Sequence, residues 1–146
     1  MLVYLDLCCI QRPLDDQTQF RIRVETEAVL GIIALCESGK VELLSSDALQ
    51  YETAKNPYPM RQAQALGVLS KAVRTVRLSP AVEARAQVLN GAGLKPLDAL
   101  HLAFAAEAGA DYFCTCDDKL LRRAQAAHSG PPKVVSPLEL IGEVGP

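Results

Sequence analysis

Residues 110–120 read Ala110-Asp-Tyr-Phe-Cys-Thr-Cys-Asp-Asp-Lys-Leu120, and this stretch decides the fold class. Its centre, residues 111–115, is short and largely apolar, which predicts a buried strand. Acids follow the strand directly, and residues 117–127 have a helical pattern. We therefore predict a strand that ends at an acid and leads at once into a helix.

The same arrangement opens the chain, where the apolar run 2–5 predicts a buried strand and Asp6 follows it. We expect a loop from there to Asp16. Further strands are predicted at 41–44, 75–78 and 133–135, with helices at 18–37, 47–54, 60–71, 80–89, 98–108 and after Ser136. Strands that alternate with helices predict an α/β fold, a three-layer α/β/α domain around a mostly parallel sheet. We expect one domain over residues 1–146.

Composition narrows the class of protein. A chain of 146 residues with 49% apolar residues and a net charge of −2 is typical of a globular domain with a real core. The first residues lack the basic segment of a signal peptide, and no uncharged stretch approaches the roughly 20 residues that span a bilayer. We therefore expect a cytoplasmic protein that does not enter a membrane.

The sequence contains five cysteines, and none of them form a C-x-x-C pair. In a reducing compartment we interpret them as thiols that pack like small apolar side chains. A zinc site built from Cys8, Cys9, Cys114 and Cys116 with a histidine is not predicted, because the spacings match no standard structural site.

Charge is unevenly distributed along the chain. Residues 53–80 and 119–138 contain basic residues and no acid. Such segregation is compatible with a basic rim that contacts a phosphodiester backbone, and equally with ordinary solvated helix faces.

Four acids are predicted to approach one edge of the sheet. Ligands of open parallel sheets bind beyond the carboxyl ends of the strands, where Asp6 and Asp117 both lie. Asp98 begins the helix before the fourth strand, and Glu52 ends the short helix after the second, from which it could reach back. Each acid alone has an ordinary explanation, as a turn former, a helix cap, a partner of the helix dipole or a solvated surface charge.

Their convergence would have a chemical consequence. Two like charges 4 Å apart repel by about 1 kcal/mol in water and about 4 kcal/mol at an effective dielectric constant of 20. Four converging carboxylates therefore require protons or a cation, and an oxygen-only ligand set suits Mg²⁺ or Mn²⁺. Such an ion can activate water for phosphoryl displacement.

Four segments together resemble the PIN-domain family over essentially the whole chain. They are Val3-Tyr-Leu-Asp6, Ser45-Ser-Asp-Ala-Leu-Gln-Tyr-Glu52, Lys95-Pro-Leu-Asp-Ala-Leu-His-Leu-Ala103 and residues 110–120. The resemblance implies an α/β/α nuclease that uses Mg²⁺ or Mn²⁺ to hydrolyse RNA, with Asp6, Glu52, Asp98 and Asp117 as catalytic and metal-site acids. It also implies a toxin of a type II toxin–antitoxin pair, inhibited by a small antitoxin protein, and a homodimer.

The chain departs from the family pattern after its first acid. The family usually has Thr or Ser there, and this chain has Leu7-Cys8-Cys9. A catalytically silent PIN fold that binds RNA or protein is therefore the alternative to the ribonuclease, and a structure-specific DNA nuclease is a weaker one. Thr115 carries a hydroxyl before the fourth acid, and Asp118 could assist or replace Asp117.

His101 lies one turn after Asp98. We interpret it as a partly buried helix residue, with a hydrogen bond to the acids as a further possibility.

Overall fold

The computed structural model describes residues 1–145. Its strands are β1 (Leu2–Leu5), β2 (Glu42–Ser46), β3 (Arg74–Val76), β4 (Tyr112–Cys114) and β5 (Lys133–Val135). Its helices are α1 (Leu7–Ile10), α2 (Phe20–Glu37), α3 (Asp47–Lys55), α4 (Pro59–Leu69), α5 (Pro80–Gly91), α6 (Pro96–Glu107), α7 (Asp118–Ala127) and α8 (Pro137–Val144). A 3₁₀ turn covers Arg12–Leu14. Within this part of the chain, no helix is both long and apolar enough to cross a membrane.

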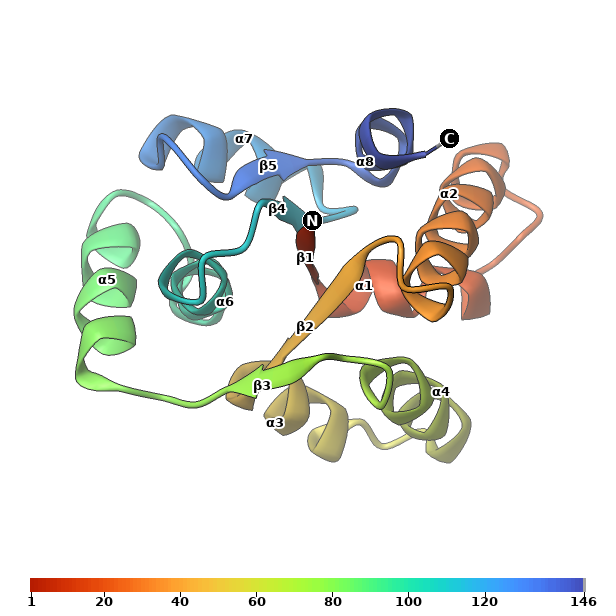
Figure 1. Ribbon diagram of the computed structural model, residues 1–146, viewed down its shortest axis with the longest axis horizontal. Coiled ribbons are helices and arrows are strands. Elements are labelled where there is room, and N and C mark those ends of the chain that lie inside the picture. Colours follow the sequence, from red (N-terminus) through yellow and green to blue (C-terminus); the bar gives the residue numbers. More distant parts are fainter. Residues whose placement is uncertain (146) are drawn as a thin grey trace.

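The five strands form one sheet in the order β3-β2-β1-β4-β5. Every neighbouring pair is parallel, and Tyr4 of the central strand lies between Leu44 and Phe113. Figure 1 shows α5 and α6 on one side of the sheet and α2 and α4 on the other. The predicted three-layer α/β/α fold is confirmed, with a sheet that is parallel throughout.

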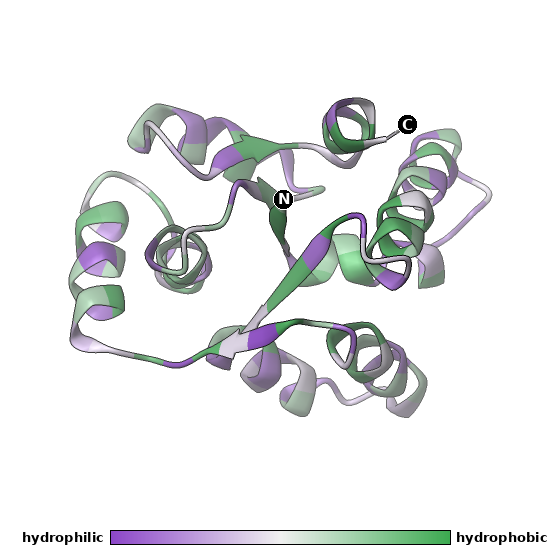
Figure 2. Ribbon diagram, viewed as in Figure 1, coloured by the Kyte–Doolittle hydropathy of each residue, from purple (hydrophilic) through white to green (hydrophobic). Residues whose placement is uncertain are grey.

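The core forms where the apolar strands meet the helix layers. Figure 2 shows the strands β1 and β4 almost entirely hydrophobic, with mixed colouring on the outer helices. Tyr4 and Phe113 stack with ring centroids 5.4 Å apart. The apolar helix α6 buries Leu102 and Phe104 completely and packs against α5 and the sheet. Its burial explains why it carries so few polar residues.

The prediction of a loop after Asp6 was wrong, because residues 7–10 form a short helix. Asp6 is the N-cap of α1, and its carboxylate accepts a hydrogen bond of 2.9 Å from the Leu7 backbone N–H. The helix turns Cys9 and Ile10 into the core, where both are fully buried. Burial of these two side chains, rather than helix propensity, explains a helix too short to show a periodic pattern.

Smaller differences concern element ends. The third strand covers Arg74–Val76 instead of 75–78, since it pairs with the last three residues of β2. Helix α5 continues to Gly91, two residues beyond the predicted end.

The parallel sheet brings separate parts of the chain to one edge. The carboxyl ends of β1, β2 and β4 are adjacent, because these strands are neighbours and run in one direction. Helix α6 leads back to the start of β4, so the first turn of α6 lies at the same edge. The four predicted acids all belong to segments that meet here.

Candidate metal centre

Asp6 is the most enclosed acid of the site. Its side chain accepts hydrogen bonds from the Leu7 backbone at 2.9 Å, the Thr115 hydroxyl at 3.1 Å and the Cys8 thiol at 3.4 Å. Only 9% of the residue is exposed. Burial, followed by the neighbouring Cys8 and the charge of Glu52, raises the pKa of Asp6 from 3.8 to about 7. The carboxylate is therefore held in place while its negative charge is poorly compensated.

Glu52 is part of a hydrogen-bonded chain that runs into the core. Its Oε1 contacts Nε2 of His101, and Nδ1 of the same ring lies 2.5 Å from the Tyr4 hydroxyl. The Tyr4 hydroxyl is in turn 2.7 Å from Ser46 Oγ, and Ser46 caps α3, the helix that carries Glu52. The chain of contacts fixes the direction of the Glu52 carboxylate from inside the protein.

His101 is almost completely buried, so the interpretation as a partly buried residue understated its enclosure. Burial lowers the pKa of His101, but the hydrogen bond to Glu52 and the charge of Asp6 outweigh it and raise that pKa above its usual value. Both ring nitrogens already have partners. His101 therefore orients an acid rather than offering a free nitrogen to a metal ion.

Asp98 lies at the third position of α6, half-buried. Burial raises the pKa of Asp98, and the nearby charges of Asp6 and Asp117 raise it further. Such repulsion indicates that Asp98 lies near Asp6 and near Asp117. Asp98 thus interacts electrostatically with both the buried Asp6 and the exposed Asp117.

Asp117 is the exposed member of the group and the N-cap of α7. Its side chain accepts hydrogen bonds from the backbone of Lys119 and Leu120 at 3.0 and 3.2 Å. Its own N–H donates to Thr115 Oγ1, the same hydroxyl that donates to Asp6. Thr115 therefore links the first and fourth acids through one oxygen atom.

Asp118 points elsewhere. It forms a two-point ion pair with Arg21 on the surface, with both distances at 2.8 Å. This geometry favours Asp117 over Asp118 as a member of the acidic site.

The donor set fits a hard divalent cation. Ligand atoms of Asp6, Glu52 and His101 all lie within 4.8 Å of one another. Asp98 and Asp117 are not part of this close group, but the charges of Asp6 and Asp117 both act on Asp98. Since the histidine nitrogens are engaged, the remaining donors are carboxylate oxygens, which Mg²⁺ and Mn²⁺ prefer. Burial and neighbouring charges raise the pKa of Asp6 and of Asp98, so their ionised forms are unfavourable here and a bound cation would stabilise them.

Two neighbours of the acids were not predicted to contact them. Tyr4 precedes Asp6 by two positions, and the alternation of side chains along β1 was a signal that they share a face. Cys8 contacts both Asp6 and Thr115, but it lies in the unpredicted helix α1.

The basic residues divide into paired and unpaired groups. Arg61, Arg77 and Lys133 form ion pairs with acids of their own chain. Among residues 1–145, ion pairs are absent for Lys119, Arg122 and Arg123 of α7, and for Lys55, which lies over the Tyr51 ring. These unpaired basic residues follow Asp117 and Glu52 in the chain. A basic rim around the acids would therefore include fewer residues than the two acid-free segments of the sequence suggested.

Comparison with known proteins places the chain in a family. The sequence model of the PIN-domain family matches residues 54–126, which are half of the chain and include Asp98 and Asp117. No curated protein gives a significant match. A chain in the crystal structure of VapBC2 from Rickettsia felis, bound to a DNA fragment from their promoter, is similar with a TM-score of 0.54 and 16% identity. The similarity covers 92% of this chain and 97% of that one, and it supports the fold alone. By its family match and its fold, the protein belongs to the PIN-domain family.

Proposed function

We propose that this protein is a metal-dependent endoribonuclease that hydrolyses RNA phosphodiester bonds. The observation that carries the proposal is that Asp6 and Glu52 lie together at one sheet edge, with Asp98 near enough for its charge to interact with those of Asp6 and Asp117. PIN domains are generally nucleases, which agrees with this chemistry. Asp6, Glu52, Asp98 and Asp117 are the residues we assign to the site.

The roles of these residues follow from their surroundings. Asp6, Asp98 and Asp117 would hold Mg²⁺ or Mn²⁺, which supplies charge neutralisation at the phosphate and a more acidic water. Glu52 is oriented by His101 and would accept a proton from the attacking water. Thr115 holds the Asp6 carboxylate in position.

The RNA backbone would contact unpaired cations on the helices next to the acids. Lys119, Arg122 and Arg123 lie on the helix that Asp117 caps, and Lys55 lies one turn beyond Glu52. Removal of such cations weakens binding uniformly across RNA sequences and reduces its salt dependence.

The likeness to a chain of VapBC2 suggests a biological role as well. We propose that the protein is the toxin of a type II toxin–antitoxin pair, works in the cytoplasm as a homodimer, and is inhibited by a small antitoxin protein. Purification of the chain with its adjacent small reading frame, followed by sizing of the complex, tests this part.

Cleavage of mixed RNA with Mg²⁺ or Mn²⁺ tests the activity. Cleavage should disappear with EDTA and in Asp98→Asn, but persist in Asp118→Asn, a matched change of an exposed acid that pairs with Arg21. Activity that survives both EDTA and Asp98→Asn would exclude the proposed chemistry.

Leu7 favours a second candidate, a PIN fold that binds RNA or protein without cutting. Leu7 offers no hydroxyl beside Asp6, where the family usually has one. This candidate predicts RNA retention on a filter with no metal-dependent products, even after long incubation.

A further inference from the structure

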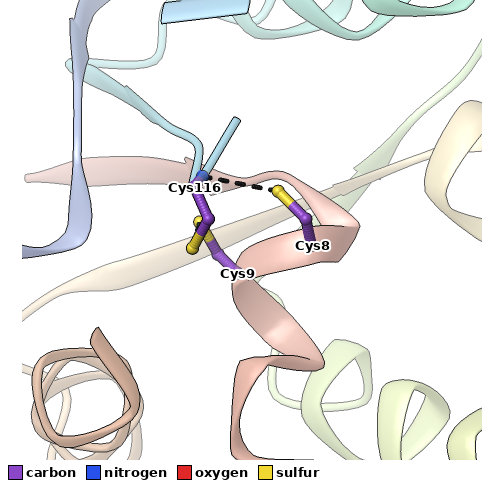
Figure 3. A group of neighbouring side chains, drawn as sticks. All are labelled: Cys8, Cys9 and Cys116. Carbon is purple, nitrogen blue, oxygen red and sulfur yellow. Dashed lines mark hydrogen bonds between the residues drawn. The ribbon is translucent and has the colours of Figure 1, made fainter. Parts of the chain in front are cut away.

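Three thiols that are far apart in the sequence lie together next to the acidic site. Cys8 and Cys9 lie on α1, and Cys116 lies in the segment after β4; Figure 3 shows the sulfurs of Cys9 and Cys116 side by side. These two sulfurs are 3.4 Å apart, and the three sulfurs all lie within 4.8 Å of one another. Cys9 and Cys116 are buried, whereas Cys8 is partly exposed.

This spacing is that of ligands around one small ion. A tetrahedral zinc ion with Zn–S bonds of about 2.3 Å separates its sulfur ligands by about 3.8 Å. The one separation of 3.4 Å is slightly below that value, and the other two do not exceed 4.8 Å, so changes of at most about 1 Å would let the thiols share one ion.

Several contacts hold the thiols in this arrangement. The Cys116 backbone N–H lies 3.4 Å from Cys8 Sγ, and N–H donors to sulfur favour the thiolate form that a metal requires. On the other side, Cys9 Sγ lies 3.7 Å from Cys114 Sγ. The neighbours of the three thiols thus include a backbone N–H and a further sulfur. The Asp6 carboxylate also contacts the cluster, through the Cys8 thiol.

We propose that Cys8, Cys9 and Cys116 form a binding site for a thiophilic metal ion of the Zn²⁺ class, separate from the carboxylate site. Thiolates select soft or borderline ions, whereas carboxylates select Mg²⁺ and Mn²⁺. Three protein ligands leave a fourth tetrahedral position for water or another donor. Ion binding releases the thiol protons to solvent, as the thiols become thiolates.

The proposal revises the expectation drawn from the sequence. A zinc site was not predicted because standard sites draw paired ligands from one short loop. Here a pair of adjacent cysteines meets a single one more than a hundred residues later, since β1 and β4 are neighbours. The strand pairing, rather than the ligand spacing, brings the sulfurs together.

Titration of the reduced, metal-free protein with Co²⁺ tests the site, because cobalt bound by sulfur gives a charge-transfer absorption band that oxygen ligands do not give. We expect one equivalent to produce this band and one equivalent of Zn²⁺ to abolish it. Cys8→Ser and Cys116→Ser should weaken Co²⁺ binding more than about 100-fold, beyond the loss of an outer-sphere partner. Cys36→Ser is the matched control, since Cys36 lies on α2 outside the cluster, and should bind as the parent does.

The parent protein decides the test even if a variant fails to fold. A sulfur-to-cobalt band in the parent that Asp98→Asn retains supports a thiol site independent of the acids. Absence of the band in the folded, fully reduced parent, or its persistence in both cluster variants, would overturn the proposal. Neither result depends on RNA cleavage, so the ribonuclease proposal can fail or stand separately.

Discussion

Replacement of Asp6 by Asn should stabilise the fold at neutral and alkaline pH in the absence of metal. The folded protein holds the Asp6 proton up to about pH 7, whereas an ordinary aspartate releases it near 3.8. A group whose pKa is raised by folding contributes most at low pH, and its contribution falls as the pH rises through this window. Asp6→Asn cannot ionise, so it avoids that loss.

The size of the effect follows from the two pKa values. A change from 3.8 to about 7 corresponds to about 4 kcal/mol at 1.36 kcal/mol per pH unit. This is an upper figure, because the Asn amide places N–H donors among the Cys8 thiol and the Thr115 hydroxyl. We expect a gain of about 1–3 kcal/mol in unfolding free energy above pH 7, and below about 1 kcal/mol near pH 4.

Urea unfolding with EDTA, from pH 4 to pH 8, measures the difference between parent and variant. Mg²⁺ or Mn²⁺ should then stabilise the parent at pH 8 and have little effect on Asp6→Asn, because bound ligand stabilises only the state that binds it. A variant less stable than the parent at pH 8, or a difference independent of pH, would refute the reasoning about an uncompensated buried charge.

Three further predictions concern the surroundings of the acids. Tyr4→Phe removes the hydroxyl partner of His101 and should lower the unfolding free energy by about 1–3 kcal/mol, measured by urea unfolding. Asp117→Asn should lose RNA cleavage while keeping thermal stability, since Asn also caps helices, and Asp117→Ala should lose cleavage together with about 1 kcal/mol. Arg21→Ala breaks an exposed ion pair with Asp118 and a 3.4 Å contact with Glu25, which keeps Arg12 as its partner, and should leave both the melting temperature and cleavage nearly unchanged.

The meeting of the segments that carry the four acids could be predicted because parallel topology determines it. Asp6 and Asp117 follow neighbouring strands, and Asp98 begins a helix that returns to the second of them. Short connections leave these residues little freedom. Glu52 needed one further assumption, that the short helix α3 directly after β2 turns back over the edge, and its contact with His101 agrees with that.

The partners of each acid could not be predicted in the same way. The position of His101 was visible one turn after Asp98, but its contacts with Tyr4 and Glu52 depend on how α3, α6 and β1 pack. Packing of this kind depends on side-chain volumes across three segments, and a periodic pattern contains no information on it. Helix α1 was missed for a related reason, since burial rather than pattern stabilises it.

The departure from the family pattern at Leu7-Cys8-Cys9 affects both proposed metal sites. It removes the hydroxyl that family members usually place after the first acid, but Asp6 still accepts hydrogen bonds from Thr115 and from Cys8. The carboxylate is thus fixed without a hydroxyl at position 7. The same substitution places two thiols on α1, where the segment after β4 brings a third. A change that looks like a loss for one metal site supplies the ligands of another, which is why the two should be tested with different ions.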